Sequence, residues 1–126
     1  MVKRSELKML TQQLLTFTNT LENKFESVKK TGKSGDFYSE VKPFADEIKE
    51  MNDKWRKEAL FFVEQKRPKN IHLQQIESAH EHIDIISVQA FFPETSLTRF
   101  KNMVASVKYI LNQVLIIINE EERELK

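Results

Sequence analysis

The chain has 126 residues, no Cys, only 2 Gly and 3 Pro, and 20 basic against 19 acidic side chains. Without Cys, disulfides, thiolate metal sites and cysteine nucleophiles are excluded, and a net charge of about +1 argues against a surface built throughout for polyphosphate. The balance of 40% hydrophobic and 31% charged residues with so little Gly and Pro is typical of an all-helical globular protein.

The first predicted helix spans about residues 5–30. Ser5 offers a hydroxyl to the free amides at its start, and Glu6 places a carboxylate near the positive end of the helix dipole. Both glycines, Gly32 and Gly35, follow shortly afterwards and predict a turn. The apolar residues recur every three or four positions, the spacing of one helical face: Leu7, Leu10, Leu14, Phe17, Leu21, Phe25 and Val28.

The second predicted helix spans about residues 38–66. Pro43 lacks an amide proton and fits only a first turn or a kink, so the helix should begin just before it. Near the other end, Leu60, Phe61 and Val63 widen the apolar face, and Pro68 stops the helix. The apolar stripe has the same three-four spacing: Val41, Phe44, Ile48, Met51, Trp55, Ala59 and Phe62.

Two further helices are predicted at about 71–91 and 95–120. The third has a narrower stripe that carries a histidine, His80, and it closes at Phe91, Phe92 and Pro93. The fourth alternates threes and fours without a miss, and its acidic end, residues 120–124, is expected to be solvated. Its stripe is entirely hydrocarbon: Leu97, Phe100, Val104, Val107, Leu111, Val114 and Ile118.

These four helices predict an all-α fold in which a single domain, residues 1–126, is an up-down-up-down antiparallel four-helix bundle. Short connections favour antiparallel neighbours, and the repeated three-four spacing predicts a left-handed bundle with shallow crossing angles of about +20°. Residues 1–8 are not followed by an uninterrupted apolar segment, and the longest apolar run, Val114–Ile118, is far short of a membrane span. We therefore expect a cytoplasmic protein without a membrane segment.

One run of residues resembles a known family. Arg67–Glu77, with the sequence RPKNIHLQQIE, is similar to the YppE-like family of small uncharacterised proteins from Bacillus-type bacteria. Asp36–Tyr38 and Val41–Pro43 upstream, and Arg99–Asn102 downstream, add to the resemblance. It implies an up-and-down four-helix bundle in the cytoplasm of such a bacterium. The family has no assigned activity, so the resemblance assigns no functional residue.

A metal centre is weakly indicated. Glu77 and His80 have the Glu-x-x-His spacing used in di-iron bundles, but such a site needs two of these steps and two further carboxylates. His80 and His82 lie on different faces of one helix, and His72 lies about 12 Å from His80 along the axis. We expect no metal, no cofactor and no catalytic residues. His80 should hydrogen-bond across the bundle, while Glu77 and Asp84 face solvent.

Basic residues gather at one predicted end of the bundle. Lys3, Arg4 and Lys8 lie at the same end as the connection 66–69, and the acidic residues 120–124 return to it. The favoured interpretation is that these charges neutralise one another. The alternative is an anion or nucleic-acid site made by Arg67, Lys69 and His72, although nucleic acid is not the favoured partner.

The function that best fits this pattern is a non-enzymatic interaction module acting through its surface. Phe61 and Phe92 each adjoin another phenylalanine, which supplies more large apolar side chains than one core requires. We expect these two residues to mark a surface for a protein partner, with a second copy of the chain as one candidate. A metal-binding bundle enzyme is the least favoured alternative.

Overall fold

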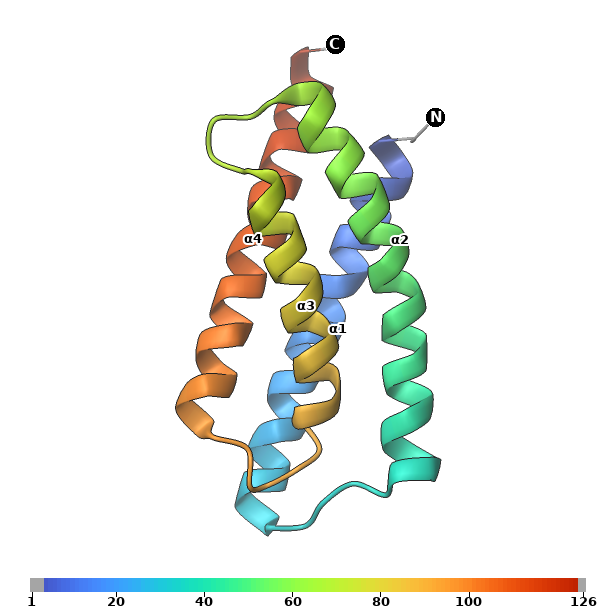
Figure 1. The fold of residues 1–126 in the computed structure, drawn as a ribbon, viewed down its shortest axis with the longest axis vertical. Coiled ribbons are helices and arrows are strands. Elements are labelled where there is room, and N and C mark those ends of the chain that lie inside the picture. The colour runs from blue at the N-terminus through green and yellow to red at the C-terminus, as the bar shows by residue number, and fades with distance from the viewer. Residues whose placement is uncertain (1–3, 125–126) are drawn as a thin grey trace.

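The computed structural model describes residues 4–124, which form four long helices (Figure 1). Helix α1 spans Arg4–Thr31, α2 spans Lys42–Lys66, α3 spans Leu73–Gln89 and α4 spans Leu97–Glu124. A short π-helical turn, η1 at Phe37–Val41, leads into α2. The described residues contain no strand, so the all-α four-helix prediction is confirmed.

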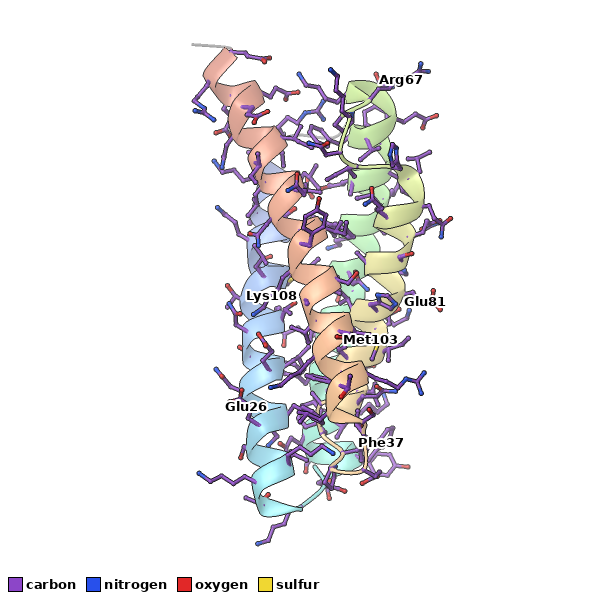
Figure 2. The ribbon with its side chains drawn as sticks, turned by 90° about the vertical axis from the view of Figure 1, so that its left-hand side faces the viewer. Glu26, Phe37, Arg67, Glu81, Met103 and Lys108 are labelled. Carbon is purple, nitrogen blue, oxygen red and sulfur yellow. The ribbon has the colours of Figure 1, made fainter. Side chains whose placement is uncertain are left out.

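Consecutive helices run in alternating directions along one long axis (Figure 1). Each of α1 and α3 packs against both α2 and α4, so every helix lies beside its neighbours in sequence. Figure 2 shows the two ends of the bundle, with Arg67 after α2 at one end and Phe37 before α2 at the other. The left-handed sense of the bundle stays a prediction.

The core is one continuous cluster in which the predicted stripes of all four helices meet. Trp55 of α2 is fully buried, and its Nε1–H donates to Thr11 Oγ1 of α1 at 3.0 Å. Phe25 of α1 and Phe100 of α4 stack with ring centroids 4.1 Å apart. The stripes therefore predicted most of the residues that face inward, but Leu97, the first residue of the fourth stripe, is 47% exposed because it lies at the start of α4, outside the core cluster.

The connections follow from local backbone chemistry. Gly32 ends α1 with a left-handed φ of 71°, and its N–H donates to Val28 O at 2.8 Å. Asp36 caps η1 by accepting the N–H of Ser39 at 2.9 Å. α2 is capped at its C-terminus by Arg67, a non-glycine residue with φ 48° and ψ 56°, whose N–H donates to Val63 O at 2.8 Å.

The fourth helix is longer than predicted. It continues to Glu124, and the acidic residues that were expected to be solvated include two half-buried ones, Glu121 and Glu122. The third helix is shorter, at Leu73–Gln89. The extension of α4 is explained by its pairing with α1, described below, which supplies tertiary stabilisation that the periodicity of apolar residues does not report.

By length and composition alone, α4 is the one helix in the described range that could cross a membrane. The core helix of a globular bundle meets the same criteria. Val104, Val107 and Leu111 of α4 are indeed buried in the core cluster.

Candidate functional site

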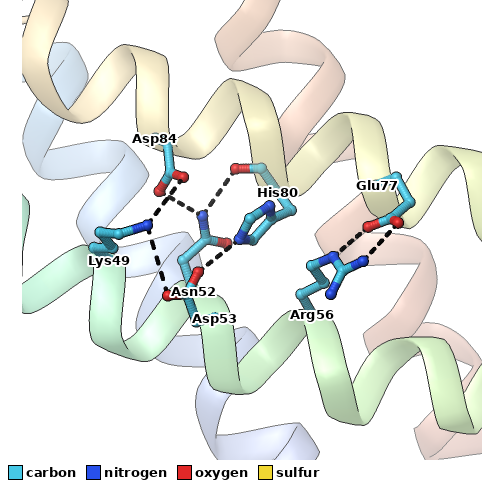
Figure 3. Close-up of polar contacts among 7 residues, drawn as sticks. All are labelled: Lys49, Asn52, Asp53, Arg56, Glu77, His80 and Asp84. Atoms are coloured by element: carbon cyan, nitrogen blue, oxygen red, sulfur yellow. Dashed lines mark hydrogen bonds and ion pairs between the residues drawn. The ribbon is translucent and has the colours of Figure 1, made fainter.

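A cluster of polar side chains joins α2 to α3 (Figure 3). At its centre, Asn52 is fully buried, and its Nδ2 donates to the backbone O of His80 at 2.8 Å and to Asp84 Oδ1 at 2.9 Å. Both acceptors belong to α3. Asn52 therefore bonds its own helix to the neighbouring helix from inside the protein.

His80 completes a second contact across the same seam. Its Nε2 lies 2.8 Å from Asp53 Oδ1, and because a carboxylate oxygen only accepts, the ring nitrogen donates. This hydrogen bond, aided by the nearby charge of Lys49, holds the pKa of the Asp53 carboxyl below its usual value. The expectation that His80 hydrogen-bonds across the bundle is confirmed.

Three side chains in this cluster offer donor atoms suited to a metal ion. One oxygen each from Asp53 and Asp84 and one nitrogen of His80 all lie within 4.8 Å of one another. Lys49 approaches both carboxylates, with its Nζ 3.6 Å from Asp53 Oδ2 and 3.9 Å from Asp84 Oδ2. We call Asn52, Asp53, His80 and Asp84 the α2/α3 cluster.

Glu77 does not join this cluster. It forms a two-pronged ion pair with Arg56 of α2, including an Nη2–Oε2 contact of 2.7 Å (Figure 3). The Arg56 hydrogen bond keeps the pKa of Glu77 below its usual value. The expectation that Glu77 and Asp84 face solvent was right only in part, because both side chains are half-exposed but also bind Arg56 and Asn52 of α2 across the seam.

The basic end is largely neutralised, as the favoured interpretation predicted. Arg4 Nε lies 2.7 Å from Glu121 Oε1, and Lys8 Nζ lies 3.0 Å from Glu122 Oε2. Lys66 Nζ lies 3.6 Å from Glu121 Oε2 and 3.7 Å from Glu124 Oε2. Lys3 lies outside the described residues. These pairs place carboxylates beside the basic side chains, so the positive charge of Arg4, Lys8 and Lys66 is compensated locally.

The three residues of the alternative anion site are all exposed. Arg67 and His72 line one open hollow together with Pro68 and Leu73, whereas Lys69 is not among the residues of that hollow. Glu64 also lines it, next to Arg67. The hollow therefore brings two of the three predicted residues together, but it adds a carboxylate that would repel an anion.

The structure separates the two residues of the predicted partner surface. Phe61 lies in the last two turns of α2 and is 41% exposed. Phe92 follows α3 at the opposite end of the bundle and packs partly buried against the core. The two phenylalanines cannot form one surface, because the length of α3 lies between them.

A second surface feature is a groove between α1 and α2, and Phe61 is not among the residues that line it. Met9, Leu10 and Met51 supply its apolar surface, and the groove has a volume of about 270 Å³. Met9 is 49% exposed. The charged lining residues are Glu6, Glu47, Glu50 and Lys54. We call this feature the α1/α2 groove.

Glu58 adds a further carboxylate beside the groove. It follows Lys54 by one helical turn, and Phe61 follows Glu58 by another, so these residues share one side of α2. Burial, followed by the neighbouring Glu6 carboxylate, raises the pKa of Glu58. Sequence reasoning missed this acidic groove because its residues come from two helices, and only their packing brings Glu6 next to Glu58.

The comparisons with known proteins agree with the resemblance read from the sequence. The model of a bacterial domain of unknown function, DUF1798, matches residues 11–118. The uncharacterised protein YppE of Bacillus subtilis strain 168 is 28% identical over 114 residues, which cover 90% of this chain and 92% of YppE.

Solved structures give the same result. The crystal structure of Bacillus subtilis YppE superimposes with a TM-score of 0.92 at 26% identity, covering 97% of this chain and 99% of YppE. A protein of unknown function from Listeria innocua gives a TM-score of 0.90 at 28% identity, covering 95% and 96%. A DUF1798 domain from Staphylococcus aureus gives 0.85 at 25% identity, covering 93% and 99%.

Proposed function

The chain belongs to the DUF1798 family of bacterial domains of unknown function, and from its own surface we propose that it is a non-enzymatic interaction module that binds a protein partner in the α1/α2 groove. The observation that carries the proposal is the pairing of the exposed Met9 and the half-buried Met51 with a rim of carboxylates. Phe61, also exposed, lies two turns beyond Lys54 on the same side of α2 and would extend this apolar surface. The cytoplasmic location expected from the sequence is part of this proposal.

The chemistry of the groove specifies a kind of partner. Methionine side chains are flexible and polarisable, so a methionine-lined groove adapts to the apolar face of a helix. Around it, Glu6, Glu47, Glu50 and Glu58 face only Lys54 among the residues named. The partner that fits is an amphipathic helix whose polar face carries Lys and Arg.

The same charge argues against a symmetric dimer through this groove. In a twofold interface each copy would present its own acidic rim to the other, and like charges would be brought together. Within one chain, burial first and the neighbouring Glu6 carboxylate second already raise the pKa of Glu58. A second copy would therefore have to use a different surface.

Binding can be measured with a defined probe. A fluorescent, helix-forming peptide of about 18 Leu and Lys residues is long enough to lie along roughly 27 Å of the groove. We expect saturable binding that weakens about tenfold or more in the variant Glu47→Lys/Glu50→Lys and in Met9→Ser/Phe61→Ser. Glu47, Glu50 and Met9 line the groove, Phe61 lies beyond it on the same side of α2, and none of the four is a buried core position.

The matched control makes the same charge change elsewhere. Glu26 of α1 and Glu81 of α3 are exposed outside the groove (Figure 2), so Glu26→Lys/Glu81→Lys should retain binding to within about threefold. Equal weakening in both charge variants would show that the peptide follows net charge alone and would overturn the proposal. So would binding that the Met9→Ser/Phe61→Ser variant leaves unchanged.

A further inference from the structure

We propose that the α2/α3 cluster binds one divalent transition-metal ion through Asp53, His80 and Asp84, with the amide oxygen of Asn52 as a fourth ligand. The site lies on the seam between α2 and α3, away from the α1/α2 groove, and does not depend on the proposed partner. It uses two ligands from each helix, so an ion bound here would join the two helices (Figure 3).

The first observation is the arrangement of the three ionisable donors. Their ligand atoms lie within 4.8 Å of one another. With metal–ligand bonds of about 2.0–2.2 Å, tetrahedral ligands stand roughly 3.3–3.6 Å apart. Asp53 has a half-exposed side chain, at 51%, so it is free to make the small rotation required. His80 Nε2 and Asp53 Oδ1 are 2.8 Å apart and share a proton in the metal-free protein. The ion would take the place of this proton.

The second observation is independent of these donors and concerns Asn52. Its Oδ1 is buried and has no hydrogen-bond partner among the described residues. Turning the amide over would not correct this, because the backbone O of His80 can only accept and therefore requires Nδ2 on its side. A buried carbonyl oxygen without a donor has lost its hydration and gained nothing in exchange, which destabilises the folded protein. Figure 3 shows this oxygen directed toward the ring of His80.

A cation satisfies all four groups together. An ion held by His80 and Asp53 would supply the positive charge that the Asn52 oxygen lacks, and Asp84 would close the site from the next turn of α3. A donor set of one imidazole and several oxygens suits Zn²⁺ and Mn²⁺ and does not suit Ca²⁺ or Mg²⁺, which favour all-oxygen sites. The usual order of affinities predicts tighter binding of Zn²⁺ than of Mn²⁺.

Lys49 is the competitor for this site. Its ammonium lies 3.6 Å and 3.9 Å from oxygens of the two carboxylates, so it neutralises them in the metal-free protein. Its side chain is 61% exposed and can swing into solvent when an ion binds. Lys49→Met should therefore raise Zn²⁺ affinity about threefold or more. A purely structural role for the cluster predicts no such gain.

The test is a titration of the chelator-treated, full-length chain with ZnCl₂ and with MnCl₂, followed by calorimetry and by amide NMR. We expect one Zn²⁺ per chain, amide shifts centred on Asn52 and His80, and weaker Mn²⁺ binding. His80→Gln should weaken Zn²⁺ binding at least about tenfold. His72→Gln, the same change at the exposed start of α3, is the control for adventitious binding and should leave it unchanged.

Several results would overturn the proposal. These are the absence of binding at 1 mM ZnCl₂, equal losses in the His80 and His72 variants, or amide shifts centred away from Asn52. If His80→Gln fails to fold, as judged by circular dichroism, Lys49→Met decides the matter: increased affinity supports the site, and unchanged or reduced affinity contradicts it.

Discussion

Single buried polar side chains hold this bundle in register. Thr11 of α1 uses its hydroxyl twice, donating to Leu7 O at 2.7 Å and accepting from Trp55 Nε1 at 3.0 Å. Thr18, two turns further along α1, is equally buried, and among the described residues its hydroxyl donates to Leu14 O at 2.7 Å and accepts from no side chain. The apolar stripes contain neither threonine, yet the first of them satisfies the one polar atom of the largest core side chain.

This difference predicts different costs for the same substitution. Thr11→Val keeps the volume but leaves the indole N–H of Trp55 buried without an acceptor, so we expect a loss of about 1–3 kcal/mol in unfolding free energy. Thr18→Val removes a hydroxyl on which no other described side chain depends, and should change stability by less than about 0.5 kcal/mol. Urea unfolding of the two variants measures both. Equal losses would contradict the assigned role of Thr11.

At the scale of elements, the connections decide how the helix ends meet. The loop before η1 passes directly against the corner between α3 and α4, where the N–H of Gly35 donates to Phe91 O at 2.8 Å. A Cβ at position 35 would lie 2.9 Å from Phe91 Cδ1 and 3.2 Å from Val41 Cγ2. Glycine is therefore required here by close approach, whereas Gly32 is required by its positive φ.

The two glycines can be distinguished experimentally. Gly35→Ala should destabilise the protein by about 1–3 kcal/mol, because the new methyl group displaces the buried ring of Phe91. Gly32→Ala has open space around its Cβ and meets only the backbone penalty, about 1 kcal/mol. Combining Gly35→Ala with Phe91→Leu, which vacates space for the methyl group, should be less costly than the sum of the single changes. Strict additivity in thermal unfolding would show that Phe91 is not the obstacle.

At the scale of the whole molecule, charge is distributed unevenly despite the near-zero net value. The end that carries Arg4, Lys8 and Lys66 is paired with the acidic end of α4. The α1/α2 groove keeps unbalanced carboxylates, and the packing of α1 on α2 forces Glu58 close to Glu6. Folding thus concentrates negative charge at one surface while it neutralises positive charge elsewhere.

The carboxylate of Glu58 predicts how the stability of the folded protein depends on pH. The pKa of Glu58 is raised in the folded protein by burial and by Glu6, so the folded state favours its protonated form. Its contribution is present at acid pH and is lost as the pH rises through the folded pKa. Glu58→Gln should therefore be more stable than the parent at pH 7, by about 2–4 °C in Tm. The difference should shrink toward zero below about pH 4.5.

Thermal unfolding from pH 4 to pH 7 measures this effect. Glu64→Gln, an exposed position further along α2, makes the same change of charge and should shift Tm by less than about 2 °C at every pH. A stabilisation by Glu58→Gln that is constant across the pH range would show that the gain does not come from the ionised carboxylate.

The sequence by itself determined the fold class, the four helices and the inward face of each, because the three-four recurrence of apolar residues is a local property of each segment. It also determined the family, through the run Arg67–Glu77 and its flanking motifs. Helix ends were less accurate, since the last turn of α4 is stabilised by contacts with α1. His80 was recognised as a residue that bonds across the bundle, but its partner was not.

Tertiary structure alone decided which polar groups of different helices meet. The spacing of the histidines along α3 rules out a metal site made from that helix alone. Nothing in the sequence pairs His80 with Asp53, 27 residues earlier, or places Asn52 between the two helices. The tertiary structure also separated Phe61 from Phe92 and brought Glu6 beside Glu58. The physical reason is that a helical period reports which face turns inward, whereas the rotation and axial offset of one helix against another depend on side-chain packing along the whole interface.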